Sequence, residues 1–128
     1  MAFAVQMTIV KGDCGGMLLR YNSSTNQGYY LAVCQNRSYQ FVKYVDFTGK
    51  TAHTLVSGSS SAIHGGWGQS NLIAVVARGS MFDLYVNGQK INSARDDSYT
   101  EGVISLFADD VSNATEVVYS TARVWTVQ

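Results

Sequence analysis

The chain has 128 residues, the length of a single domain, and its nine Lys and Arg residues balance nine Asp and Glu residues. Charged residues make up only 14% and are scattered, which excludes the basic stripe of a nucleic-acid binder and the polybasic helix of a membrane-surface protein. No apolar run approaches the roughly 20 residues that span a bilayer, and the N-terminal segment lacks the basic residues of a signal peptide. We therefore expect a soluble domain with neither a nucleic-acid nor a membrane partner, and any export signal would lie outside this chain.

Apolar and polar residues alternate with period two along almost the whole chain, whereas helical periodicity is nearly absent. The first segment, MAFAVQMTIV, places its large apolar residues from Phe3 to Ile9 on one face. Further strands are expected at 16–22, 28–34, 38–46, 52–57, 71–78, 81–87, 89–94, 102–109 and 115–127. The dipeptides Asn87-Gly88 and Gly79-Ser80 predict tight hairpin turns between neighbouring strands. Short strands at such regular spacing are typical of an antiparallel sandwich.

The two cysteines can be placed by the register of a hairpin between 16–22 and 28–34. A register that pairs Arg20 with Gly28 also places Leu18 opposite Tyr30 and Cys14 opposite Cys34. Directly opposed positions in an antiparallel pair are close enough for a disulfide bond. We therefore expect a Cys14–Cys34 disulfide and an extracellular or extracytoplasmic location, with two separate buried thiols as the alternative.

Three segments carry a resemblance to a known group of folds. GGMLLRYNSSTNQGYYLAV and NLIAVVARGSMFDLYVNGQKI are similar to two hairpins of concanavalin A-like lectin and glucanase jelly rolls. DDSYTEGVISLFAD followed by EVVYSTARVW resembles their closing strands. The most similar group is the laminin-G-like and family-sixteen-glycoside-hydrolase-like domains of bacterial extracellular proteins, from about residue 3 to residue 127. The resemblance implies an all-β, two-sheet antiparallel jelly-roll sandwich.

The chain departs from this group at its N-terminus. Such domains usually begin with one or more strands before the segment that FAVQMTIV matches, and this chain begins there. The resemblance therefore implies a single sandwich domain, 1–128, that is a fragment or a circularly trimmed form, or that takes its missing N-terminal strand from another chain. An open edge rich in Val, Met and Ile would pair readily with another strand, so we expect self-association or acceptance of a strand through the N-terminal edge.

The acidic residues do not match the pattern of the glucanase branch, which places its carboxylates as E-x-D-x-E on one strand. The only two glutamates, Glu101 and Glu116, lie on separate segments. A retaining glycosidase needs two carboxyl groups about 5–5.5 Å apart. The histidines and cysteines provide neither a Ser/His/Asp triad nor a zinc site by spacing. These observations favour a protein that is not an enzyme.

The sequence also contains two pairs of adjacent aspartates, at 96–97 and 109–110. Neighbours on a strand point to opposite faces, so each pair is a poor catalytic dyad. Capping of turns is one interpretation of both pairs. A calcium site built from Asp96, Asp97 and nearby carbonyl oxygens is the alternative for the first pair, because hard cations bind clustered oxygens. No other cofactor is expected.

A sugar-binding function requires fewer specialised residues than catalysis, because aromatic faces pack on the C–H surfaces of a sugar and polar side chains bind its hydroxyls. The candidate ligand-binding residues are Trp67, His64, Asn71, Arg20, Tyr30 and Asp83. Trp67 has glycine on both sides in SAIHGGWGQSN, so it is either exposed for contact or folded back as an anchor of the loop. The resemblance places Arg20 on the concave sheet, where it would bind an internal aspartate such as Asp83 or a ligand. Trp125 is expected in the core.

The first hypothesis for function is a non-catalytic extracytoplasmic binding or adhesion module whose partner is a carbohydrate. The second is a glycoside-hydrolase-like enzyme with carboxylates from separate strands. The third is a structural module that assembles through an open sheet edge.

Overall fold

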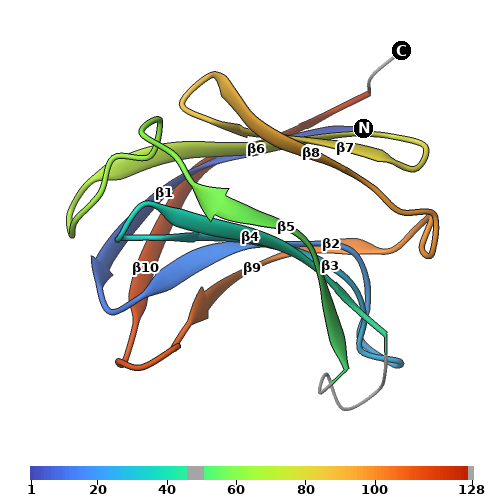
Figure 1. The fold of residues 1–128 in the computed structure, drawn as a ribbon, viewed down its shortest axis with the longest axis horizontal. Coiled ribbons are helices and arrows are strands. Elements are labelled where there is room, and N and C mark those ends of the chain that lie inside the picture. Colours follow the sequence, from blue (N-terminus) through green and yellow to red (C-terminus); the bar gives the residue numbers. More distant parts are fainter. Residues whose placement is uncertain (46–50, 127–128) are drawn as a thin grey trace.

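The computed structural model describes residues 1–45 and 51–126, and it contains ten strands in two antiparallel five-stranded sheets (Figure 1). The strands are β1 (Ala2–Lys11), β2 (Cys14–Asn22), β3 (Gln27–Cys34), β4 (Ser38–Tyr44), β5 (Ala52–Ser59), β6 (Ser70–Arg78), β7 (Met81–Val86), β8 (Gln89–Arg95), β9 (Val103–Asp109) and β10 (Glu116–Trp125). Sheet A has the order β10-β1-β6-β7-β8, and sheet B has the order β5-β4-β3-β2-β9. Every expected strand is present; the expected ends at Asp46 and Val127 lie outside the described residues. None of the described residues forms a helix that could cross a membrane.

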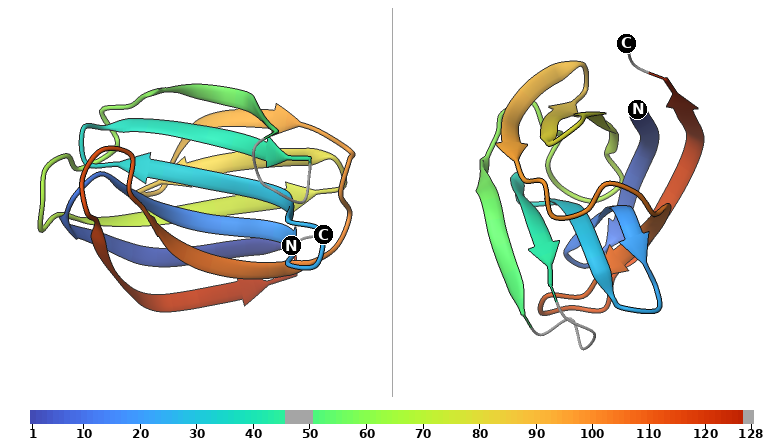
Figure 2. Two further views of the ribbon diagram at one scale, coloured as in Figure 1. Left: turned by 90° about the horizontal axis from the view of Figure 1, so that it is seen from below. Right: turned by 90° about the vertical axis from the view of Figure 1, so that its right-hand side faces the viewer.

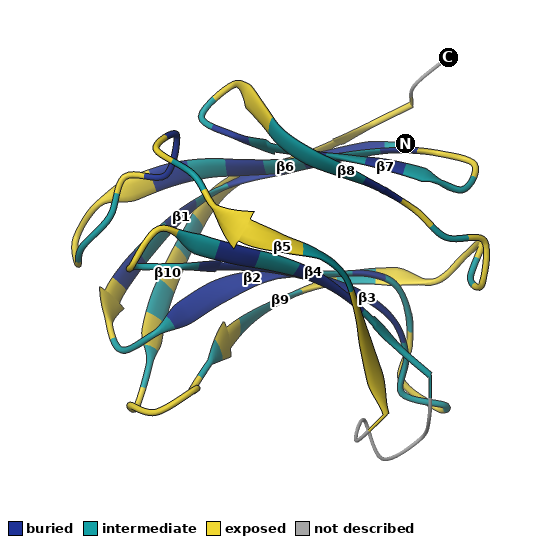
Figure 3. Ribbon diagram, in the orientation of Figure 1, coloured by how far each residue is buried: buried dark blue, intermediate teal, exposed yellow. Residues whose placement is uncertain are grey.

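The core lies between the two sheets and follows from the alternation in the sequence. On β1 the alternate apolar residues from Phe3 to Ile9 are buried, as predicted, and β7 has the same pattern (Figure 3). At the centre, the rings of Tyr29 and Phe41 stack at 5.7 Å, and Phe82 packs against both of them. Each fully buried large side chain contributes about 1.5–3 kcal/mol to stability, so this face holds the sheets together.

The predicted hairpins are present, and the predicted register of β2 and β3 holds from Cys14 to Leu19. Asn87 and Gly88 have φ angles of 53° and 81°, and a two-residue hairpin turn of type I′ requires a positive φ at both positions. On β2 and β3, Cys14 lies opposite Cys34 with 4.0 Å between their Cα atoms, and the two residues form a disulfide. The disulfide prediction is therefore confirmed.

One part of that register is wrong. The β2–β3 ladder is regular from Cys14 to Leu19, but its next pair joins Asn22 to Gln27, so Arg20 does not pair with Gly28. The extra residue forms a β-bulge in which Arg20 has a φ angle of 49°. The bulge changes which side chains of β2 face the core beyond Leu19.

The prediction of an open N-terminal edge is also wrong. β1 pairs along its length with β6 on one side and with β10 on the other, so the C-terminal strand covers the edge that β1 would otherwise expose. β10 is the edge strand instead, and its last residues are exposed. Trp125 is 47% exposed there, which corrects its expected place in the core. An edge strand with one uncovered face cannot bury the residues that alternation places on that face.

Tyr119 of β10 joins the two sheets through its phenol. The hydroxyl accepts a hydrogen bond from the Gly16 N–H at 2.7 Å and donates toward the carbonyl oxygens of Gly16 and Phe107. These acceptors belong to β2 and β9 of sheet B, whereas Tyr119 belongs to sheet A. Burial raises the pKa of Tyr119 to about 12, so the phenol is a neutral donor at ordinary pH.

Replacement of Tyr119 by phenylalanine is expected to lower the free energy of unfolding by about 2 kcal/mol, because buried backbone groups lose their partner. Alkaline pH gives a second readout. The folded pKa of about 12 exceeds the value of about 10 for an unfolded tyrosine, so the native protein should lose stability as pH rises between these values. The Tyr119→Phe variant should lose less stability than the wild type over that pH range. Denaturant titrations of both proteins test this, with Tyr85→Phe as the control that should change little.

Candidate functional site

The outer face of sheet B, which points away from sheet A, is concave. Figure 1 shows that the sheet bends at both ends toward the same side, where the β9–β10 loop and the β2–β3 turn lie. The left view of Figure 2 looks onto this face, with β2, β3 and β4 crossing its middle. Two pockets lie on it, and both contain side chains that alternate with those of the core.

The first pocket, of about 360 Å³, is named here the tyrosine pocket. Its lining residues are Leu18, Tyr21, Asn26, Tyr30, Tyr44, Phe107 and Asp109. Tyr30 lies at its centre: its ring stacks on Tyr44 with centroids 5.3 Å apart, and Phe107 meets it edge-on at 5.0 Å. These contacts fix the rings before any ligand arrives. Tyr44 and Phe107 remain partly exposed, so they offer apolar surface to a ligand.

The polar groups of the tyrosine pocket are arranged around the Tyr30 hydroxyl. It donates to Asp109 Oδ2 at 3.1 Å and accepts a hydrogen bond from Gln40 Nε2 at 3.1 Å. Burial, with the nearby charge of Asp109, raises the pKa of Tyr30 far above its usual value, so it stays a neutral donor. The other carboxylate oxygen of Asp109, Oδ1, has no hydrogen-bond partner among the described residues. That oxygen can accept a hydrogen bond from a ligand.

The β-bulge in β2 brings Tyr21 into the same pocket. Because the bulge adds a residue after Leu19, Tyr21 lies on the outer face, and its hydroxyl donates to Asn26 Oδ1 at 2.6 Å. The Asn26 amide nitrogen makes no hydrogen bond within the part of the chain that the structure describes. It therefore provides a hydrogen-bond donor at the rim of the pocket, whereas Asp109 provides an acceptor.

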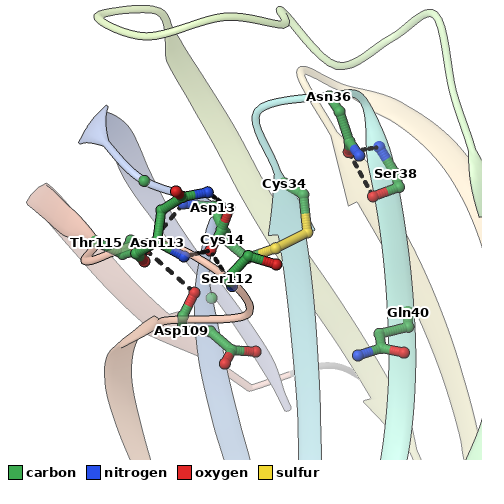
Figure 4. The surroundings of a disulfide bond; sticks show 12 residues. Asp13, Cys14, Cys34, Asn36, Ser38, Gln40, Asp109, Ser112, Asn113 and Thr115 are labelled. Atoms are coloured by element: carbon green, nitrogen blue, oxygen red, sulfur yellow. Dashed lines mark hydrogen bonds between the residues drawn. A yellow bond between two sulfur atoms is a disulfide. The ribbon is translucent and has the colours of Figure 1, made fainter.

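The second pocket, of about 560 Å³, is named the disulfide pocket, because Cys14 and Cys34 contribute to its lining (Figure 4). The other lining residues are Asp13, Gln35, Asn36, Ser38, Tyr39, Gln40, Ser57, Gly58, Val111 and Ser112. Asp13 holds one wall in place. Its carboxylate accepts hydrogen bonds from the backbone N–H groups of Ser112 and Asn113 at 2.7 and 2.8 Å, which fixes the β9–β10 loop. Those bonds lower the pKa of Asp13, so the carboxylate is ionised.

The two pockets adjoin, and together they are called the sheet B groove. Gln40 lines the disulfide pocket, while its amide donates to Tyr30 in the tyrosine pocket. Cys14 of the disulfide pocket lies directly opposite Asp109 of the tyrosine pocket. Along β3 the distance from Tyr30 to Cys34 is about 13 Å at the usual rise of a strand. The groove is thus longer than a single sugar ring.

Of the residues predicted to bind a ligand, only Tyr30 lies in this groove. Arg20 lies on the core side of β2, with its guanidinium 4.8 Å from the centre of the Phe82 ring and Nη1 donating to the Tyr99 carbonyl at 3.0 Å. The bulge causes this, since regular alternation would have placed the side chain on the concave face. Asp83 faces outward from sheet A, where it binds Lys90 at 3.1 Å.

Asn71 and His64 hold the β5–β6 loop to the start of β6. Asn71 is only 4% exposed; its side chain accepts from the His64 N–H at 2.8 Å and donates to the His64 carbonyl at 3.1 Å. Asn87 Nδ2 donates to the same Asn71 oxygen at 2.9 Å. The imidazole of His64 is exposed and lies 3.0 Å from the Ser70 carbonyl oxygen. The amide of Asn71 is therefore occupied by the loop itself.

Trp67 is both exposed and anchored, two states that the sequence analysis treated as alternatives. The indole is 58% exposed, yet its Nε1 donates to the Gly12 carbonyl at 3.1 Å. The backbone around it is held too, because the Gly68 N–H donates to the Ile9 carbonyl and the Gly66 N–H donates to the Gln35 carbonyl. Trp67 is thus an exposed aromatic residue on an anchored loop, outside the lining of both pockets.

The two calcium candidates have different surroundings. Asp96 is largely buried, and its carboxylate accepts hydrogen bonds from the Tyr29 hydroxyl at 2.6 Å and from Lys43 Nζ at 3.1 Å. Burial alone would raise the pKa of Asp96, but these bonds and two from Ser98 hold it well below its usual value. Asp97 is exposed. No three His, Cys, Asp or Glu side chains gather into a metal site among residues 1–45 and 51–126. The calcium site remains a prediction, and a cation there would compete with Lys43.

The groove contains residues that the sequence analysis did not select as binding residues. Asp109 was interpreted as a turn cap, and Gln40 and Phe107 were not considered. Gln40 carries a usable signal, because β3 and β4 form a tight hairpin whose register places it beside Ala32, two residues from Tyr30. No local signal points to Asp109, because its strand β9 pairs with β2, which lies far away in the sequence.

The two five-stranded antiparallel sheets and their order define the chain as an all-β sandwich with the jelly-roll fold. Among solved structures, it is similar to the carbohydrate-binding module CBM66 from Bacillus subtilis, with a TM-score of 0.77 and 19% identity over 94% of this chain and 71% of that one. It is also similar to sheep galectin-11 in complex with glycerol, with a TM-score of 0.69 and 8% identity over 95% of this chain and 86% of that one. No protein-family model and no curated protein matches the sequence. At these identities the likeness establishes the fold, and the finer resemblance to laminin-G-like domains stays a prediction.

Proposed function

We propose that this chain is a carbohydrate-binding module that holds its ligand in the sheet B groove. One observation carries the proposal: on the concave sheet, partly exposed aromatic rings surround Tyr30, and the open carboxylate oxygen of Asp109 lies beside them. Ligand sites typically combine such apolar surface with a few convergent polar groups. The likeness to a carbohydrate-binding module and to a galectin in complex with glycerol supports the same function.

The chemistry of the groove suits a sugar. The faces of a pyranose or furanose ring carry C–H groups that pack on Tyr44 and Phe107, while its hydroxyls both donate and accept hydrogen bonds. Asp109 Oδ1 is available as an acceptor, and the Asn26 amide nitrogen is available as a donor. Because Tyr30 is already held by two hydrogen bonds, little conformational entropy is lost when a ligand binds.

The disulfide supports an extracytoplasmic location for this function. A bond between Cys14 and Cys34 persists in oxidising compartments, where glycans of cell walls and cell surfaces are also found. A module for adhesion to such glycans requires only this groove, without catalytic groups.

The surroundings of the acidic residues favour binding over hydrolysis. Two carboxylates line the groove, Asp13 and Asp109. A glycosidase needs one carboxyl group with a raised pKa to protonate the leaving oxygen. The pKa of Asp13 is lowered by the hydrogen bonds from the β9–β10 loop, and its oxygens are engaged there. Asp13 is therefore unsuited to be the acid that the reaction requires.

A glycan array followed by calorimetry on the strongest binder tests the proposal. Truncation of the ring in Tyr44→Ala is expected to weaken binding by about tenfold or more, because the apolar surface over Tyr30 is lost. Tyr85→Ala is the matched control: it removes a tyrosine from the outer face of sheet A and should change affinity by less than about twofold. Circular dichroism of each variant shows whether the fold is kept.

Trp67→Ala distinguishes the groove from the β5–β6 loop. Since Trp67 lies outside both pockets, we expect this variant to retain binding. If Trp67→Ala abolished glycan binding while Tyr44→Ala retained it, the loop would be the site and the groove would not. If wild type bound no glycan, the proposed function itself would be wrong.

A further inference from the structure

We propose that the sheet B groove selects uncharged oligosaccharides, longer than one sugar ring, over glycans that carry carboxylate or sulfate groups. The inference rests on the proposed function and adds the ligand class. Two features of the groove carry it: the charge of its lining and the separation of its two pockets.

The lining of the groove is acidic. Its ionisable charges are those of Asp13 and Asp109, and no Lys, Arg or His of the described residues lines either pocket. Proteins that bind carboxylate or sulfate groups do so with Arg or Lys, whose N–H groups pair with the anionic oxygens. Such a partner is missing from the described lining of both pockets.

Two cationic side chains on the strands beside the tyrosine pocket are committed elsewhere, and Arg37, next to Asn36 and Ser38 of the disulfide pocket, lines a separate pocket with Gly65 and Gly66. Lys43 of β4 binds Asp96 at 3.1 Å and Ser98 at 3.0 Å. The guanidinium of Arg20 lies over the Phe82 ring inside the sandwich, with Nη1 on the Tyr99 carbonyl. Neither side chain can turn to the groove without the loss of these contacts. Among the described residues, no cationic group would therefore offset the repulsion between Asp109 and an anionic sugar.

The repulsion between Asp109 and an anionic sugar is large enough to make the groove selective. The open oxygen of Asp109 lies next to Tyr30, Tyr44 and Phe107, where apolar surface reduces the screening of charge by water. A carboxylate placed within hydrogen-bond reach of it is repelled by enough to lower affinity about tenfold. An uncharged hydroxyl at the same place gains a hydrogen bond to a charged acceptor instead.

The separation of the two pockets sets the length of the ligand. One ring can fill the tyrosine pocket, but Cys34 and the neighbouring Gln35 and Asn36 of the disulfide pocket lie about 13 Å or more from Tyr30 along the direction of β3. A second and a third ring are needed to reach them. Affinity should therefore rise from the monosaccharide to the trisaccharide.

The test uses isothermal calorimetry at low ionic strength with two sets of probes. Neutral gluco-, manno- and fructo-oligosaccharides, from the monosaccharide to the pentasaccharide, are compared with oligomers of galacturonate and mannuronate of equal length. We expect at least one neutral series to bind about tenfold more tightly than any uronate of the same length, with affinity rising up to the trisaccharide. Salt should narrow this difference by screening.

Asp109→Asn keeps the shape of the side chain and removes its charge, so it should reduce the preference for neutral chains severalfold. Asp83→Asn is the matched control, because Asp83 is an aspartate on the outer face of sheet A, bound to Lys90, and should leave the preference unchanged. Thermal denaturation verifies that both variants fold.

The outcomes separate the two claims. If uronates bind the wild type as tightly as neutral chains, and Tyr44→Ala weakens both, the selectivity is refuted while the carbohydrate site stands. A monosaccharide that binds as tightly as its trisaccharide refutes the length requirement. If no glycan of either set binds, the proposed function fails and the inference fails with it.

Discussion

Reduction of the Cys14–Cys34 disulfide is expected to lower the free energy of unfolding by about 3 kcal/mol and the Tm by about 10 °C. The two residues are 20 apart in sequence, so the bond removes the entropy of a sizeable loop from the unfolded chain. It also joins β2 to β3, which lie next to each other inside sheet B. Differential scanning calorimetry with and without reductant measures the change.

The double variant Cys14→Ser/Cys34→Ser provides the control for that measurement. It should match the reduced wild type in Tm and should not respond to reductant. Because both cysteines line the disulfide pocket, oligosaccharide binding should also weaken on reduction. A change in the free energy of unfolding below about 1 kcal/mol would show that strand pairing alone holds this end of the sheet.

The strands were predictable because their signal is local. Period-two alternation places Phe3 to Ile9 on one face in the sequence, and the same residues are buried in the structure. Turn residues carry a local signal as well, since Asn87-Gly88 meets the requirement for positive φ at both positions. The cysteine register followed from a hairpin of neighbouring strands, where counting residues is sufficient up to the first irregularity.

Two errors arose where local counting does not apply. The β-bulge at Arg20 gives a positive φ to a residue that is not glycine, and the sequence carries no mark of it. The pairing of β1 with β10 joins opposite ends of the chain, so it could not be read from spacing along the sequence. The first error paired Arg20 with Gly28, and the second left β1 as an open edge.

The candidate site combines both kinds of information. Tyr30 was selected from its own strand, but the group that defines its chemistry, Asp109, is 79 residues away. Asn71 shows the converse problem, because a polar residue beside an interesting loop was selected for its type. In the structure its side chain binds the backbone of that loop. Residue type alone does not distinguish a polar group that awaits a ligand from one that already has a partner.

Gly16→Ala is expected to have the largest effect of any single substitution proposed for this chain. A Cβ atom at Gly16 would lie 1.7 Å from the Leu31 carbonyl oxygen and 2.8 Å from its carbon. Leu31 is fully buried in β3, between β2 and β4, so its backbone cannot move away without breaking the ladders on both sides. The Tyr119 hydroxyl also binds the backbone of Gly16. We expect a loss of more than about 4 kcal/mol in the free energy of unfolding, or failure to fold.

Gly58→Ala is the matched control for this substitution, on the edge strand β5. There the nearest atom to the new Cβ would be the Tyr39 hydroxyl oxygen at 3.0 Å, which is the tip of a side chain and can shift slightly. The control should lose less than about 1.5 kcal/mol and should remain soluble. Urea titrations of the two variants give the comparison, and soluble yield serves where Gly16→Ala cannot be purified. Equal stability of the two variants would show that β2 and β3 can separate at Gly16, and that the close approach of the strands there is not essential to the floor of the groove.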